Sequence, residues 1–142
     1  MRLVFAALAT LLAGTAAAQP RPFSCLGAEQ MEEDVFAVPF ARGSAVLGEA
    51  ARSPLAAAVE TARRDPQRVI CVLGHAGQEG GAVTSTRLAA ERARAVAQAL
   101  AEHGVDRERI RAEARNAQFS PRVRANEPPS RTVTVIVMPA AP

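Results

Sequence analysis

The sequence contains no tryptophan, tyrosine or lysine, and it has only two histidines and two cysteines among 142 residues. Without tryptophan and tyrosine, the chain has almost no aromatic side chains on which nucleic-acid bases could stack. Its net charge of +3 is also too small to suggest a nucleic-acid surface. The length suits one compact domain. We therefore expect a single domain that does not bind nucleic acid.

The usual sequence signatures of catalytic sites are also missing. The chain has no Gly-x-Ser-x-Gly elbow and no helix with paired histidines for zinc. The glycine-rich segment 77–81 lacks the Lys-Ser/Thr of a phosphate-binding loop. Cys71 lies within an expected strand, where a thiol is inert rather than nucleophilic. We predict that the protein is not an enzyme and uses no metal or other cofactor.

The N-terminus carries the longest apolar run. A charged start at Met1-Arg2, an apolar segment over 3–12 and small residues up to Ala18 are typical of a secretory signal peptide, residues 1–18. The run is too short for a membrane-spanning helix, and no later segment is apolar for long enough. Residues 21–24 do not resemble a lipoprotein cleavage box. The sequence therefore predicts export to a bacterial periplasm and no membrane span.

Export of the protein would allow its two cysteines to form a disulfide. Cys25 and Cys71 are the only possible pair, and an oxidising compartment permits a disulfide between them. The alternative is two unrelated thiols, with Cys71 acting as a small buried hydrophobe. We favour the disulfide, which would tie an irregular lead, residues 19–34, to the centre of the domain.

Four segments have the patterns of β-strands. Residues 69–73 form an apolar, β-branched run that ends at glycines, as is typical of an interior strand covered on both faces. Residues 35–40 alternate, and Pro39 indicates an edge strand because proline donates no ladder hydrogen bond. Two further apolar patterns predict strands over 109–114 and 131–138.

Two segments have helical periodicity. The first is 47–64, where Ser53-Pro54 is typical of an N-cap followed by proline, so the regular helix begins or kinks there. Asp65-Pro66 ends this helix. The second helix runs from residue 84 to about 103, where Gly104 stops it.

The remaining segments lack periodicity. Residues 115–130 contain three arginines and three prolines, which predict a long, basic surface loop. Residues 139–142 form a tail. The element order βαβαββ predicts one α+β sandwich over 35–138, with both helices on one face of the sheet. No linker divides this segment into two domains.

One charged residue of the second helix points inward. On a helical wheel, Arg92 falls within an apolar face formed by Leu88, Ala89, Ala93, Val96, Ala99 and Leu100. Ser85 lies about two turns earlier on the same side. A buried charge must be paired or must reach a wet pocket. Arg92 is therefore either a structural arginine, paired or extended along apolar surface, or a ligand-binding one.

The central strand and the second helix share a specific pattern of residues. It consists of Gly74-His75-Ala76-Gly77, Gly80, Leu88, Glu91-Arg92-Ala93-Arg94-Ala95-Val96, Leu100 and Gly104-Val105. This pattern resembles the OmpA-like peptidoglycan-binding domain family. Further similarities are Phe40, Gly43-Ser44-Ala45 and Leu47 near the first strand, and Ser130-Arg131-Thr132-Val133 before the last. The resemblance implies a mixed four-stranded sheet of order 1-4-2-3.

The resemblance also implies a ligand. The family binds the peptide stem of peptidoglycan and holds its diaminopimelate between an aspartate and an arginine. The arginine falls on Arg92, which would project toward residues 74–81 with its guanidinium free to hold a carboxylate. The aspartate position is Gly77, so the carboxylate for the ligand's ammonium is missing. Glu79 either substitutes for it or is a solvated loop carboxylate.

The implied site contains further changes. The family's asparagine position is Ser85, the serine after Leu88 is Ala89, and one of two late arginines remains, Arg131. The candidate peptidoglycan site consists of Arg92, Gly77, Ser85, His75, Leu88 and Arg131. Two functions stay open: a periplasmic cell-envelope module that binds diaminopimelate-type peptidoglycan weakly, or a degenerate copy that binds or scaffolds another envelope protein. An association with the outer membrane also stays open.

Overall fold

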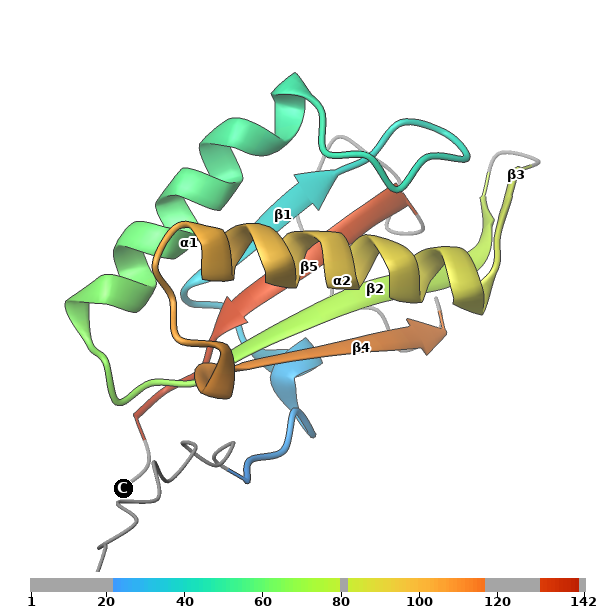
Figure 1. The fold of residues 1–142 in the computed structure, drawn as a ribbon. Coiled ribbons are helices and arrows are strands. Elements are labelled where there is room, and N and C mark those ends of the chain that lie inside the picture. The colour runs from blue at the N-terminus through green and yellow to red at the C-terminus, as the bar shows by residue number, and fades with distance from the viewer. Residues whose placement is uncertain (1–21, 80–81, 117–130, 141–142) are drawn as a thin grey trace, which may run out of the picture.

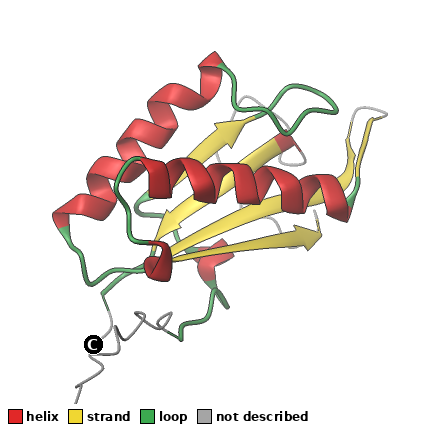
Figure 2. Cartoon of the chain, viewed as in Figure 1, coloured by secondary structure: helices red, strands yellow, loops and turns green. Residues whose placement is uncertain are grey.

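Two helices lie across one face of a mixed β-sheet (Figures 1 and 2). The computed structural model describes residues 22–79, 82–116 and 131–140. The predicted signal peptide, most of the predicted basic loop and the end of the tail lie outside these residues.

Four strands form the main sheet in the order β1-β5-β2-β4. They are β1 (Val35–Pro39), β2 (Ile70–Glu79), β4 (Ile110–Asn116) and β5 (Thr132–Val137). β5 is antiparallel to β1 and β2, whereas β4 is parallel to β2. Among these four strands the order agrees with the predicted 1-4-2-3, although the whole sheet has a fifth strand that the predicted order lacks. The interior position of the strand before Gly74 and the edge position of the strand with Pro39 are confirmed.

A fifth strand was not predicted. β3 (Ala82–Thr84) pairs antiparallel with residues 77–79 of β2, and this hairpin extends beyond the main sheet (Figure 1). β2 therefore continues past the glycines at which the sequence pattern ends. The predicted number of four strands was wrong because glycine and the polar residues around it have low strand propensity. The pairing between β2 and β3 overrides that local preference.

The first long helix begins differently from the prediction. α1 (Arg52–Arg64) follows η2 (Glu49–Ala51), and its N-cap is Ala51, which makes no side-chain capping hydrogen bond. The prediction of Ser53 as the N-cap was wrong. Ser53 and Pro54 lie in the first turn, where proline is tolerated because N–H groups there have no partner within the helix.

The second long helix has well-defined ends. α2 (Thr86–Glu102) is capped by Ser85, whose Oγ accepts a hydrogen bond from the backbone N–H of Leu88 at 3.1 Å. At the other end, Gly104 has φ 96°, a left-handed conformation that favours glycine. The N–H groups of Gly104 and Val105 donate to carbonyls of the last helical turn. This stop confirms the predicted end of the helix, and η3 (Arg107–Arg109) then leads into β4.

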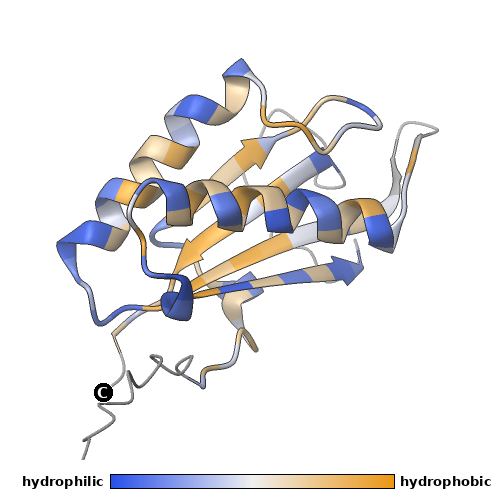
Figure 3. Ribbon diagram, in the orientation of Figure 1, coloured by the Kyte–Doolittle hydropathy of each residue, from blue (hydrophilic) through white to orange (hydrophobic). Residues whose placement is uncertain are grey.

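The main core lies between the helices and the sheet. Hydrophobic residues of the strands and of the inner sides of both helices meet there (Figure 3). Among them, Val72, Val96, Val133 and Val135 are fully buried. Gly74 lets α2 approach β2 closely, since a Cβ at this position would lie 2.1 Å from the carbonyl oxygen of Ala89. This contact fixes how near the two elements lie.

The lead, residues 22–34, covers the other face of the sheet. It contains one short helix, η1 (Ala28–Gln30), and is otherwise irregular as predicted. Cys25 forms the predicted disulfide with Cys71 of β2, with an S–S distance of 2.04 Å and a Cα–Cα distance of 5.8 Å. Around it, Leu73 and Ile136 pack against the lead. The central strand is therefore covered on both faces, as its apolar run predicts.

Candidate ligand-binding site

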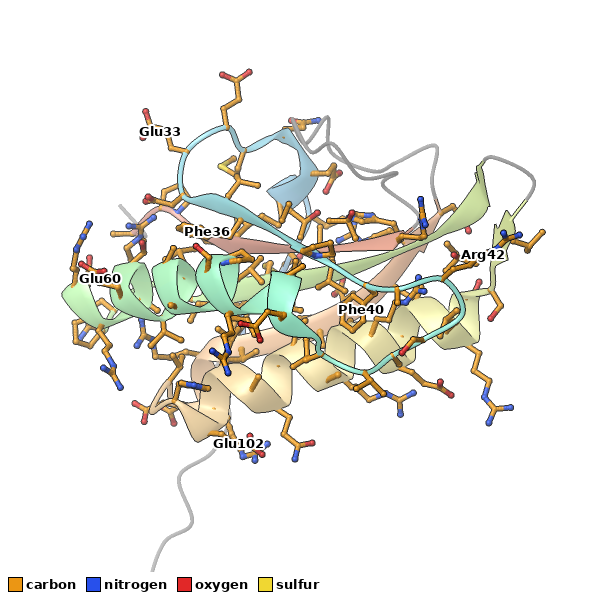
Figure 4. The ribbon with its side chains drawn as sticks, turned by 90° about the horizontal axis from the view of Figure 1, so that it is seen from above. Glu33, Phe36, Phe40, Arg42, Glu60 and Glu102 are labelled. Atoms are coloured by element: carbon orange, nitrogen blue, oxygen red, sulfur yellow. A yellow bond between two sulfur atoms is a disulfide. The ribbon has the colours of Figure 1, made fainter. Side chains whose placement is uncertain are left out.

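Arg92 is buried between α2, the end of β3 and the loop that follows β1. It is 1% exposed. Its Nε donates to the carbonyl oxygen of Ser44 at 2.7 Å, and its Nη2 donates to the carbonyl oxygen of Ala41 at 3.1 Å. Its Nη1 lies 3.5 Å from the hydroxyl of Thr84. Figure 4 shows the loop that carries these carbonyls, between Phe40 and α1, beside the N-terminal half of α2.

These contacts compensate for burying the charge. The guanidinium carbon lies 5.5 Å from the centroid of the Phe40 ring, a geometry in which the ring face attracts a cation. Burial, and next the charge of Arg131, lower the pKa of Arg92. Arginine nevertheless stays charged in proteins, so the carbonyl oxygens and the ring stabilise a cation here. The expected free guanidinium is not observed, because the loop at 41–44 already accepts its hydrogen bonds.

Gly77 lies close to Arg92 through the β2–β3 hairpin. It pairs directly with Thr84, and residues directly opposite each other in an antiparallel pair project to the same face. Thr84 is buried, and its hydroxyl is the group that Arg92 approaches. A side chain at position 77 would therefore project beside Thr84 and toward Arg92. The two positions that the family resemblance pairs are both neighbours of Thr84, but glycine provides no carboxylate.

Three other predicted site residues border this cluster. The hydroxyl of Ser85 serves as the N-cap of α2, and Leu88 is half-buried in the first turn of that helix. Arg131 is half-buried, and its carbonyl oxygen accepts a hydrogen bond from the N–H of Phe40 at 2.8 Å. The Glu79 side chain lies outside what the structure describes. The site therefore combines the β2–β3 hairpin, the start of α2, the loop after β1 and the residue before β5.

His75 does not join the cluster. It lies on the face of the sheet that the lead covers, where its Nε2 is 2.8 Å from the hydroxyl oxygen of Thr134. Burial, and next the charge of Arg115, lower the pKa of His75 to about 4. The imidazole is therefore neutral at pH 7, and its hydrogen bond joins β2 to β5.

Sequence analysis missed several residues that position Arg92. Ala41 and Ser44 act through their backbone carbonyls, which leave no side-chain signal in a sequence. Thr84 acts through its hydroxyl, and its place opposite Gly77 follows from β3, which was not predicted. Phe40 belongs to the segment that resembles the family's first strand, but its contact with Arg92 could be inferred only with the loop in place.

Among the residues that the structure describes, no group of three or more histidine, cysteine, aspartate or glutamate side chains could hold a metal ion. No helix in this part of the chain is both long and apolar enough to cross a membrane.

Comparison with solved structures identifies the fold. The OmpA-like domain of FopA1 from Francisella tularensis subsp. tularensis SCHU S4 is 21% identical, with a TM-score of 0.57 over 79% of this chain and 80% of that one. The peptidoglycan-associated lipoprotein from Burkholderia pseudomallei is 20% identical, with a TM-score of 0.55 over 72% and 87%. The cell wall anchor of the T6SS from Pseudomonas aeruginosa is 20% identical, with a TM-score of 0.53 over 71% and 78%.

Comparison of the sequence with protein families is more specific. No curated protein matches the chain. The model of the OmpA family matches residues 39–133, which is most of the chain and includes both long helices. The protein is therefore a member of the OmpA family.

Proposed function

We propose that this protein is a non-catalytic module of the cell envelope that binds the peptide stem of diaminopimelate-type peptidoglycan weakly, with Arg92 as the main contact. The observation that carries the proposal is that Thr84 pairs with Gly77 in the hairpin and lies 3.5 Å from the guanidinium of Arg92 through its hydroxyl. Family membership supports it, as do similar structures named as a peptidoglycan-associated lipoprotein and a cell wall anchor. The predicted signal peptide would bring the protein to the periplasm, where peptidoglycan is accessible.

Binding would require an exchange of hydrogen bonds at Arg92. A ligand carboxylate would take guanidinium donors that now bind the carbonyl oxygens of Ala41 and Ser44. A hydrogen bond between two charged groups is stronger than one to a neutral carbonyl. The new hydrogen bonds of the guanidinium would therefore be stronger than those they replace. The loop at 41–44 must move to allow it, and this movement reduces the net binding free energy.

The glycine at position 77 weakens the site further. A ligand ammonium would find no carboxylate there, and one charge-assisted hydrogen bond contributes about 1.5–3 kcal/mol. This loss corresponds to roughly ten- to a hundredfold weaker binding than in a domain with aspartate at that position. The same two features favour a second candidate, a degenerate OmpA-like domain that binds or scaffolds another envelope protein.

Binding to purified diaminopimelate-type sacculi tests the proposal. The wild type should bind weakly, Gly77→Asp should bind roughly ten- to a hundredfold more tightly, and Arg92→Ala should not bind. Arg92→Lys keeps the charge but loses the two-pronged geometry, so it should also bind less. Arg87→Ala is the matched control, because Arg87 lies in the same helix, is exposed and pairs only with Glu91 among the described carboxylates.

Each variant must first give the circular dichroism spectrum of the wild type. If the wild type binds tightly and both Arg92 variants bind equally well, the wall contact lies elsewhere. If none of the folded variants binds, including Gly77→Asp, the peptidoglycan proposal fails and the protein-partner function replaces it.

A further inference from the structure

A groove lies between α2 and β4, on the other side of α2 from Arg92. It has a volume of about 310 Å³ and is lined by Arg94, Ala97, Gln98, Arg107, Ile110 and Ala112. The alanines are small, and together with half-buried Ile110 they form an apolar floor. Figure 1 shows α2 running beside β4 along the length of this strand. The groove therefore follows an edge of the sheet.

The two arginines at the groove differ from six other arginines among the described residues. Arg52, Arg64, Arg68 and Arg87 form ion pairs with glutamate or aspartate, as do Arg111 and Arg115. By contrast, Arg94 and Arg107 are exposed, and neither forms an ion pair with a described carboxylate. On α2, the carboxylate of Glu91 pairs with Arg87, and that of Glu102 accepts a hydrogen bond from Gln98. The rim of the groove is therefore positively charged.

The edge strand offers a second kind of contact. Among the described strands, β4 pairs with β2 alone. A strand with one partner has backbone N–H and C=O groups directed away from the sheet, and an extended peptide can pair with these groups. On β4, the charged side chains of Arg111 and Arg115 contact the lead rather than the groove. The groove beside this edge keeps its apolar floor.

We propose that the α2–β4 groove binds an extended, acidic segment of a partner protein. The segment adds to the edge of β4, places an apolar side chain over Ala97 and Ala112, and directs carboxylates to Arg94 and Arg107. Charge complementarity selects this occupant, since the described residues that line the groove include two arginines and no carboxylate. This contact is independent of the Arg92 site, so either one can fail without the other.

A synthetic nine-residue peptide, blocked at both ends, with glutamate at positions 3 and 7, valine at position 5 and threonine elsewhere, is a direct probe, because alternate residues of a strand face the same side. We expect its addition to the isotopically labelled, disulfide-bonded protein to shift the amide resonances of β4 and of residues 94–98. Arg94→Gln with Arg107→Gln should weaken binding roughly three- to tenfold at low salt, since exposed ion pairs contribute little each. Ala97→Leu, which fills the groove without changing its charge, should also weaken binding.

Two controls separate this contact from general attraction between charges. Arg52→Gln with Arg87→Gln removes two exposed arginines elsewhere and should leave the affinity unchanged. A peptide with lysine in place of glutamate should not bind. The proposal is overturned if the glutamate peptide does not bind, or if its shifts map outside the groove. It is also overturned if sedimentation reveals a dimer that the Arg94→Gln, Arg107→Gln double variant dissociates, because a second copy would then be the occupant.

Discussion

The two faces of the sheet are covered in physically different ways. α1 and α2 cover one face with a continuous set of apolar side chains from both helices and four strands. The short lead covers the other face with few apolar side chains, a disulfide and hydrogen bonds from arginines. In particular, Arg115 donates to the carbonyl oxygen of Cys25 and to the carboxylates of Glu29 and Glu113.

The difference follows from segment length. A long amphipathic helix buries enough apolar surface to offset the conformational entropy lost when it orders. The lead is too short to do this by packing, so a covalent bond and charge-assisted hydrogen bonds hold it. We therefore expect the helix face to respond to changes in side-chain volume, and the lead face to respond to redox state, pH and charge.

Loss of the disulfide should give the largest effect. Cys25 and Cys71 are 46 positions apart, and closing a loop of this length stabilises a protein by about 4 kcal/mol in the chain-entropy model. Cys25→Ala with Cys71→Ala should therefore lower the free energy of unfolding by about that amount. Urea unfolding of the variant and of the oxidised wild type measures it, and equal midpoints would mean that the lead is held by packing.

The matching test on the helix face is Gly74→Ala. The added Cβ would collide with the carbonyl oxygen of Ala89, a backbone atom that cannot move without the helix, so we expect a loss of about 3 kcal/mol. Gly48→Ala is the control, since nothing lies within 4 Å of a Cβ there and its φ is −101°. In thermal or urea unfolding, the Gly74→Ala variant should be much less stable than the Gly48→Ala variant. Similar stabilities would show that the close packing of α2 on β2 does not depend on the missing side chain of Gly74.

The lead face should also lose stability in mild acid. The pKa of His75 is about 4 in the folded protein, below the 6.5 that is ordinary for histidine, so the unfolded chain binds more protons between these two pH values. Stability should therefore fall as pH decreases from about 6.5 toward 4, by about 2 kcal/mol between pH 7.5 and pH 5. His75→Gln should remove this component. If its unfolding free energy has the same pH dependence as that of the wild type, another group is responsible.

The smallest expected difference separates two arginines of β4. Arg115 is 18% exposed and holds the lead through several acceptors, so Arg115→Gln should cost about 1–2 kcal/mol. Arg111 is 53% exposed, and Arg111→Gln should cost less than about 1 kcal/mol. Arg115→Gln should also raise the pKa of His75, which nuclear magnetic resonance titration can follow. Equal effects of both variants on stability would argue against Arg115 as the anchor of the lead.

Apolar periodicity and cysteine pairing predicted much of this structure. They located both long helices, the four main strands, the disulfide and the inward direction of Arg92, because each depends on side-chain chemistry visible in the sequence. The β2–β3 hairpin was missed since its strands contain glycine and polar residues, and their pairing is a tertiary effect. The acceptors of Arg92 were missed because they are backbone carbonyls, and any residue at 41 and 44 would supply them.

The contact between Gly74 and α2 also limits how the Arg92 site can change. Ala89 lies one helical turn before Arg92, so the distance of α2 from the sheet sets how far the guanidinium reaches. A lift of the helix by about 1 Å would stretch the 2.7 Å bond to Ser44 beyond hydrogen-bonding distance. Position 74 thus constrains the geometry of the proposed site although it lies outside that site. Redesign of this site, whether by mutation in nature or in the laboratory, must keep position 74 without a side chain.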